Sequence, residues 1–159
     1  AQLSRGLGDV YKRQTVYGPY GRPDMSILRF IHWIINEEKV KVFGNGEQQR
    51  SFTYIEDVVD ALIRMSGLEN SHTFNVGSNI TVSLNEVIKL IEEFTGKNAN
   101  IEKLERAYKD PDVVRPNLEK INEATGWEPT TKIQEGIGKT VSWYKENEDY
   151  LKDLVYVNE

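Results

Sequence analysis

The sequence has no cysteine and only two histidines, His32 and His72. The lack of cysteine excludes disulfides, thiolate chemistry and cysteine-type zinc sites. Two histidines do not supply a typical metal site, so we expect no bound metal. There is also no run of about eighteen apolar residues and no apolar signal-peptide core at the start, so we expect a cytoplasmic protein without a membrane partner.

Sequence patterns that mark nucleotide-binding and hydrolytic enzymes are absent as well. A Rossmann dinucleotide site needs G-x-G-x-x-G after a strand, whereas Gly6-Leu-Gly8 follows no expected strand and has no third glycine. We interpret these two glycines as part of a flexible end. The Walker pattern G-x-x-x-x-G-K and the serine-hydrolase signatures are also missing.

The composition that remains is that of a single globular domain. The 159 residues are 38% hydrophobic and 10% aromatic, which allows one core and argues against disorder. The net charge is −5, from 20 basic and 25 acidic residues. Because the two signs are interspersed along the chain, we expect no nucleic-acid partner.

Hydrophobic periodicity predicts helices that alternate with short strands, which indicates an α/β fold. The expected strands lie at residues 15–19, where a strand runs into a turn, and at 40–43, 52–54, 73–76 and 99–104. The expected helices begin at Asp24, Thr53, Ser83, Asn117 and Thr131, and the last ends near Asn147. Because the strands are few and short, the chain resembles half of a larger α/β protein more than a complete doubly wound sheet.

Local signals set the expected helix ends and turns. Capping boxes are predicted at three pairs, Thr53 with Glu56, Ser83 with Glu86, and Thr131 with Gln134. Gly96 and Gly126 stand where helix C-cap glycines belong, and residues 44–46, Gly-Asn-Gly, predict a tight turn. The second helix is expected to bury the apolar residues Val58, Val59, Leu62, Ile63 and Met65.

Two arginines stand out as candidates for anion binding. Arg50 follows the glycine turn and precedes a helix, and Arg115 lies between Val114 and Pro116. A guanidinium group holds a diphosphate through paired hydrogen bonds. The alternative is that both are ordinary solvated arginines, since most arginines are largely exposed. Likewise, Tyr17, Tyr20, Phe43 and Phe52 either stack on a base or sugar or pack in the core and loops.

Four segments together resemble one enzyme family over about residues 15–147. They are residues 15–25 (TVYGPYGRPDM), 42–57 (VFGNGEQQRSFTYIED), 74–77 (FNVG) and 126–129 (GWEP). Their order and spacing resemble the C-terminal half of extended short-chain dehydrogenases/reductases that act on nucleotide-diphosphate sugars, and the first segment is similar to the loop of UDP-glucuronate 4-epimerases. The resemblance implies an α/β substrate-binding lobe with few short strands and several helices, with the Rossmann half largely absent.

The resemblance also implies a chemistry and a cofactor. In the family, NAD takes a hydride from the sugar C4 and a Tyr-x-x-x-Lys pair supplies the base. No tyrosine of this chain is followed by lysine four residues later, so no catalytic residue is assigned here. We expect the chain to be inactive alone, with NAD held only in a full-length parent.

The family's binding residues map onto ten positions of this sequence. The resemblance places Arg50 on the nucleotide diphosphate and Arg115 near the second phosphate arginine. It places Val42 and Phe43 at the uracil, with Gln48 close by, and Thr15 and Arg22 at the C6 carboxylate of a uronic acid. The residues expected to approach the nicotinamide end of NAD are Tyr17, Gly18 and Pro19. Asn117 departs from the pattern, since an aspartate is common there, and Asp57 is expected to be structural.

The resemblance suggests a division of the chain and leaves other functions open. We expect an irregular segment at residues 1–14, a nucleotide-sugar-binding domain at 15–147 and a frayed helical or irregular tail at 148–159. The alternatives to an epimerase lobe are a free-standing UDP-sugar-binding module and part of a dehydratase or decarboxylase. Because the family's lobe packs against its Rossmann half, we also expect an exposed apolar face, with homodimerisation or other self-association and partial disorder near residues 1–20.

Overall fold

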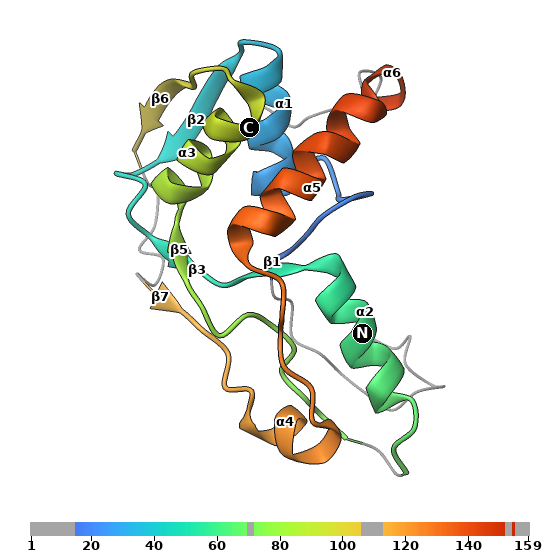
Figure 1. Cartoon of the computed structure of the whole chain (residues 1–159). Helices are drawn as coiled ribbons and strands as arrows, with labels where there is room; N and C mark the ends of the chain where they lie inside the picture. Colours follow the sequence, from blue (N-terminus) through green and yellow to red (C-terminus); the bar gives the residue numbers. More distant parts are fainter. Residues whose placement is uncertain (1–14, 70–71, 106–112, 152–153, 155–159) are drawn as a thin grey trace.

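A computed structural model describes residues 15–69, 72–105, 113–151 and 154 of the chain. Its elements alternate between strands and helices, which confirms the α/β class (Figure 1). In chain order they are β1 (Thr15–Tyr17), α1 (Ser26–Ile35), β2 (Lys39–Phe43), β3 (Gln49–Arg50), β4 (Phe52–Tyr54), α2 (Ile55–Met65), β5 (Val82–Ser83), α3 (Leu84–Thr95), β6 (Asn100–Leu104), β7 (Val113–Val114), α4 (Glu119–Thr125), α5 (Ile133–Glu146) and α6 (Glu148–Leu151).

The strands form three small sheets rather than one continuous sheet. β1 pairs with β4 in parallel, and β2 pairs with β6 in parallel. β3 is the central strand of the third sheet, antiparallel to β5 and parallel to β7. Each parallel pair joins segments that are far apart in sequence, so these sheets tie distant parts of the chain together.

The larger hydrophobic core lies where α1, α3 and α5 pack against one another beside β2 (Figure 1). Apolar residues three and four apart on α1 supply much of it, as the sequence period predicts. Ile27, Ile31 and Ile34 are each 1% exposed or less. Leu151 of α6 is 1% exposed and joins the same core, so the predicted tail contributes to it.

A second, smaller core holds α2 against α4 and the segment that follows α4. Trp127 is fully buried there, and its indole Nε1 donates a hydrogen bond to the backbone oxygen of Asp57 at 3.0 Å. The Asp57 carboxylate accepts three more hydrogen bonds, from the backbone and hydroxyl of Thr130 and the backbone of Thr131, at 3.1–3.2 Å. The structural role predicted for Asp57 is therefore confirmed.

Several predicted helix ends are confirmed. Ser83 and Glu86 form both hydrogen bonds of a capping box at the start of α3. Gly96 and Gly126 adopt left-handed conformations, with φ of 72° and 66°, directly after α3 and α4. These ends follow the sequence because each one depends on contacts within a single turn.

Other local predictions are wrong, because long-range contacts use the same groups. Neither α2 nor α5 has a side-chain cap. The Thr53 hydroxyl instead accepts a hydrogen bond from the backbone N–H of Ser78 at 3.0 Å. Thr131 donates its backbone N–H to Asp57. Residues 73–76 form no strand, although Phe74 and Val76 are buried.

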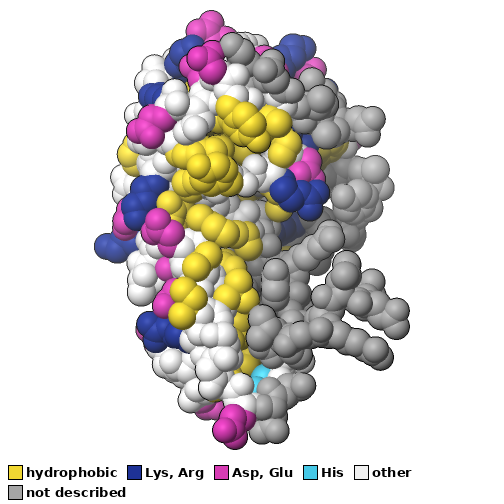
Figure 2. Space-filling view, turned by 90° about the vertical axis from the view of Figure 1, so that its right-hand side faces the viewer, with side chains coloured by type: hydrophobic (Ala, Val, Ile, Leu, Met, Phe, Trp, Pro, Cys, Tyr) yellow, Lys and Arg dark blue, Asp and Glu magenta, His cyan; other side chains and the backbone are white. Residues whose placement is uncertain are grey.

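The predicted buried face of α2 is only partly correct. Val58 and Met65 are buried, but Val59, Leu62 and Ile63 are 46%, 41% and 66% exposed. Figure 2 shows the side of the molecule on which α2 lies, where hydrophobic side chains gather in a band. The expected apolar face is therefore present, and α2 contributes to it.

Candidate functional site

The third sheet brings the two candidate phosphate arginines into the same part of the molecule. Arg50 is the last residue of β3, and its Cα partner across the parallel ladder is Val114 of β7. Arg115 is the residue after Val114 and is exposed. The Arg50 guanidinium donates to the backbone oxygen of Gln49 at 2.7 Å. Two cationic side chains that are 65 positions apart in sequence thus start from neighbouring backbone positions.

The turn before Arg50 has the glycine geometry that the sequence predicts. Gly44 and Gly46 have φ of 81° and 78°, a region that residues with side chains rarely adopt. The backbone N–H of Glu47 donates to the Asn45 side chain at 3.1 Å, which tightens the turn further. This geometry turns the chain from β2 into β3, and so connects the expected base-binding strand to the expected phosphate arginine.

The three residues expected near a base lie on either side of that turn. Phe43 ends β2 and is 38% exposed, whereas Val42 is 1% exposed and therefore buried, so of these two residues only Phe43 is open to a ligand. Gln48 is 8% exposed and donates its Nε2 to the Phe43 oxygen at 3.2 Å. The Gln48 Oε1 atom is buried and has no hydrogen-bond partner among the described residues, which leaves an acceptor for a donor group.

A cavity of about 510 Å³ gathers most of the other expected contacts. Its lining includes Tyr17, Gly18, Pro19 and Arg22, the loop that follows β1, together with Ile55 from the start of α2. Gly18 has φ of 139°, and a Cβ there would lie 2.5 Å from the Ile55 side chain. Only glycine therefore lets the loop approach α2 this closely. Thr15 lies in β1, partly buried, and does not line this cavity.

Arg22 is already engaged in an ion pair within the cavity. Its Nε and Nη2 donate to the two carboxylate oxygens of Asp24 at 3.0 and 2.6 Å. The hydrogen bonds from Arg22 hold the pKa of Asp24 below its usual value. Both side chains are substantially exposed, so the pair is accessible to solutes. The sequence analysis did not predict this pair, although Asp24 is only two residues from Arg22.

The Tyr17 side chain points into the core rather than into solvent. It is 5% exposed, packs edge-on against Phe52 and Tyr54, and approaches Gly136 of α5 so closely that a Cβ there would be 2.0 Å from the hydroxyl. Burial raises the pKa of Tyr17 well above its ordinary value. Tyr17 thus remains protonated at neutral pH and positions the loop more than it offers a reactive group.

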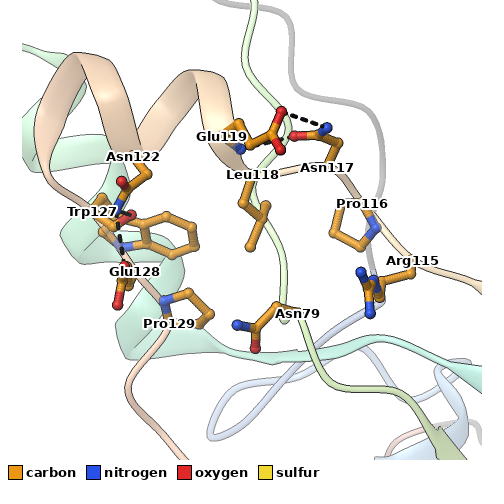
Figure 3. A pocket seen from close by; sticks show the side chains of 10 residues that line it. All are labelled: Asn79, Arg115, Pro116, Asn117, Leu118, Glu119, Asn122, Trp127, Glu128 and Pro129. Carbon is orange, nitrogen blue, oxygen red and sulfur yellow. Dashed lines mark hydrogen bonds between the residues drawn. The ribbon is translucent and has the colours of Figure 1, made fainter.

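A second cavity, of about 500 Å³, has Arg115 on its rim (Figure 3). Asn79 and Arg115 lie on one side of it, and Trp127, Glu128 and Pro129 lie on the other. Polar side chains around the cavity are tied to one another. Asn117 donates to Glu119 at 3.1 Å, and Asn122 donates to Glu128 at 3.1 Å. Asn117 also accepts the backbone N–H of Glu119 at the start of α4, so it has a structural role.

The predicted residues therefore divide into three groups. Phe43 precedes the glycine turn and Gln48 and Arg50 follow it, the residues from Tyr17 to Arg22 share one cavity, and Arg115 lines the other. Sequence reasoning missed β3, β5, β7 and Asn79. The strands have two residues each and the 113–114 strand lies in a loop fixed by prolines, so no period of hydrophobicity marks them.

Comparison with known proteins identifies the family to which the chain belongs. A family model described as GDP-mannose 4,6 dehydratase matches residues 11–140. The chain belongs to this family. The matched residues cover most of the chain and include every candidate site residue discussed above.

Relatives within the family act on nucleotide sugars. The chain is 40% identical to a UDP-glucuronate 4-epimerase of Thermodesulfobacterium geofontis over 146 residues, which are 91% of the chain and 45% of that protein. The structure of MoeE5 in complex with UDP-glucuronic acid and NAD superposes with a TM-score of 0.82 at 30% identity, covering 87% of this chain and 47% of that one. For the UDP-glucuronic acid 4-epimerase from Bacillus cereus, in complex with UDP-glucuronic acid and NAD, the TM-score is 0.79 at 26% identity, covering 87% and 44%.

These comparisons confirm the resemblance seen in the sequence motifs. The chain corresponds to the C-terminal part of an extended short-chain dehydrogenase/reductase of the nucleotide-sugar epimerase and dehydratase group, and spans about 45% of the length of such relatives. In the described part of the chain, no helix is long and apolar enough to cross a membrane. Within the same residues, no group of three or more acidic or histidine side chains is placed to hold a metal ion.

Proposed function

We propose that this chain is the substrate-binding part of an NAD-dependent nucleotide-sugar 4-epimerase whose substrate is UDP-glucuronate. The observation that carries the proposal is the parallel pairing of Arg50 with Val114, which places the backbones of Arg50 and Arg115 side by side. A guanidinium group suits a diphosphate, because it can donate paired hydrogen bonds to the charged phosphate oxygens. The named relatives, which bind or act on UDP-sugars, support the same ligand.

The base end of the ligand would lie across the glycine turn from Arg50. The exposed ring of Phe43 offers a face for stacking on uracil. The Gln48 Oε1 atom, which has no partner among the described residues, offers a hydrogen-bond acceptor. Because a buried acceptor without a partner is costly, a donor from the ligand would stabilise the loop as well as the complex.

The sugar end would lie at Arg22, with Thr15 nearby. Asp24 uses the Nε and Nη2 atoms of Arg22, which leaves the Nη1 edge for the C6 carboxylate of a uronic acid. Asp24 thereby fixes the orientation of the guanidinium before the substrate arrives. This arrangement favours glucuronate over glucose because only glucuronate brings an anion to Arg22.

The loop of Tyr17, Gly18 and Pro19 would close against the nicotinamide end of NAD. The cavity beside this loop is lined largely by glycine, proline and apolar side chains, which fits a planar ring. NAD bound there would supply the acceptor and donor of the hydride at the sugar C4. The residues of this chain would bind the nucleotide, orient the sugar and cover the cofactor, whereas the tyrosine base would come from outside these 159 residues.

Calorimetric titration of the chain tests the proposal in two steps. UDP should bind the wild type, and Arg50→Ala and Arg115→Ala should each weaken binding, whereas Arg64→Ala on α2 serves as the matched control. UDP-glucuronate should then bind more tightly than UDP-glucose, and Arg22→Ala should remove that preference. A folded chain that binds neither UDP nor UDP-sugars would contradict the proposal.

Two other functions remain distinguishable by experiment. If the chain is a non-catalytic UDP-sugar-binding module, it binds ligand but adds no epimerase activity to any longer protein that contains it. If the parent is a dehydratase, which the family description allows, its product from a nucleotide sugar is a 4-keto-6-deoxy sugar. If the parent is a decarboxylase, it releases carbon dioxide. Product analysis with the parent enzyme separates these reactions from epimerisation.

A further inference from the structure

The glycine turn that leads to Arg50 is fastened to the start of helix α3 by one asparagine. Asn85 is the second residue of α3, and its backbone N–H donates to the Gly46 oxygen at 3.2 Å. Its side-chain Nδ2 donates to the Asn45 oxygen at 3.1 Å and to the Glu47 carboxylate at 2.6 Å. A single residue therefore bonds to three consecutive residues of the turn.

Asn85 packs so closely against the turn that no side chain fits at Gly46. A Cβ on Gly46 would lie 2.1 Å from the Asn85 Oδ1 atom and 2.7 Å from its Cγ atom. Such distances are far below van der Waals contact, so the turn approaches α3 as closely as only a glycine permits. Gly46 is also buried, which shows that the approach is part of a packed contact rather than a surface encounter.

The same region of the chain holds the strand that carries Arg50. In β3, Arg50 is the Cα partner of Val82 and Gln49 is the Cα partner of Ser83, the N-cap residue of α3. The Thr81 hydroxyl donates to the Gln49 side chain at 2.8 Å. Residues 81–85 therefore contact residues 45–47 and 49–50, and Figure 1 shows β3 and β5 side by side.

We propose that Asn85 is a positioning residue that fixes the glycine turn and thereby sets the place of Arg50 for nucleotide-diphosphate binding. This inference rests on the proposed function, in which Arg50 contacts the diphosphate. Asn85 does not touch the ligand; it acts through the turn. Because Asn85 is partly exposed and lies in the first turn of a helix, water can satisfy the groups released by its loss, and alanine is the better helix former. Its removal should therefore affect the ligand more than the fold.

The test compares Asn85→Ala with Asn98→Ala, a substitution of an exposed asparagine outside the turn. Each variant is titrated with UDP by calorimetry, and its thermal unfolding and the deuterium uptake of residues 44–50 are recorded. We expect Asn85→Ala to weaken UDP binding by about five- to tenfold. The uptake of residues 44–50 should rise while the midpoint of thermal unfolding stays close to that of the wild type. Gly46→Ala should also weaken UDP binding, because the added Cβ displaces Asn85, but it should lower the midpoint of thermal unfolding as well, because Gly46 has φ of 78°.

A double variant shows whether the effect passes through Arg50. In the Arg50→Ala background, Asn85→Ala should weaken UDP binding no further, since the group that it positions is gone. UDP affinity within about twofold of wild type in Asn85→Ala, or an equal loss with and without Arg50, would overturn the inference. If the folded wild type binds no UDP at all, the proposed function itself fails, whereas wild-type binding that depends on Arg50 but not on Asn85 refutes only the positioning role.

Discussion

Arg50 and Val114 are Cα partners in the parallel ladder between β3 and β7, and Arg115 directly follows Val114. This pairing relates two arginines that the sequence could place only as separate candidates. Although β3 has only two residues, its pairing fixes the backbone from which the long Arg50 side chain extends. The site is thus assembled from the glycine turn, the start of α3 and the segment that leads to α4.

The three hydrogen bonds of Asp57 predict a large effect on stability. Asp57→Ala removes the acceptor of two backbone N–H groups and one hydroxyl in the segment at Thr130 and Thr131. A hydrogen bond to a charged acceptor is worth about 1.5–3 kcal/mol. We expect urea unfolding to show a loss of at least about 2 kcal/mol for Asp57→Ala. Asp60→Ala, which removes only an exposed ion pair with Arg64, should change stability by about 0.5 kcal/mol or less. Equal effects of the two substitutions would contradict the account.

His32 predicts a specific dependence of stability on pH. Its Nδ1 lies 2.7 Å from the Tyr144 hydroxyl and its Nε2 lies 3.5 Å from the Glu38 carboxylate. Burial lowers the pKa of His32 below its ordinary value of 6.5, although Glu38 partly opposes the shift. The unfolded chain therefore binds the proton more readily, and the free energy of unfolding should fall as the pH drops below about 6.5.

Urea unfolding at several pH values between about 7.5 and 5 checks this prediction against His32→Asn. The wild type should lose more stability on acidification than the variant, because only the wild type must protonate a buried imidazole on unfolding. If the wild type instead gains stability relative to the variant at low pH, the Glu38 carboxylate outweighs burial and the assignment is wrong.

The exposed apolar residues of α2 predict self-association of the chain. Leu62 and Ile63 are 41% and 66% exposed, and exposed apolar patches favour association. The variant with Leu62→Lys and Ile63→Lys should shift light scattering towards the monomer. Ile80→Lys replaces an equally exposed residue outside α2 and should leave association unchanged. A wild type that is monomeric at all concentrations would refute the prediction.

Local signals in the sequence were enough to predict most helices and their ends. The period of α1, the capping box of Ser83 and the glycines at positions 96 and 126 each depend on contacts within one or two turns of chain. The boxes expected at Thr53 and Thr131 failed for the opposite reason. Both residues have the neighbours that a capping box requires. However, the Thr53 hydroxyl accepts a hydrogen bond from the backbone of Ser78, and the backbone N–H of Thr131 donates to Asp57.

The candidate site was predictable in its residues but not in its arrangement. The motif around Arg50 predicts anion binding, which stays a prediction, and the Tyr-Gly-Pro segment corresponds to a loop that lines a cavity. The burial of Val42 and the hydrogen bonds from Asn85 to the turn depend on tertiary packing. Such contacts join positions with no shared period or spacing, so a single sequence carries no signal for them. The division of the chain at residues 14 and 147 stays a prediction.

The central claim is that Arg50 binds the diphosphate of a nucleotide sugar, and the affinities for UDP and uridine test it most directly. Both ligands share the base and ribose, so the difference between their dissociation constants isolates the diphosphate. The account predicts that the wild type binds UDP more tightly than uridine, and that Arg50→Ala loses about 1.5–3 kcal/mol of UDP affinity while its uridine affinity stays the same. Equal loss of affinity for both ligands, or no loss for UDP, would contradict the account.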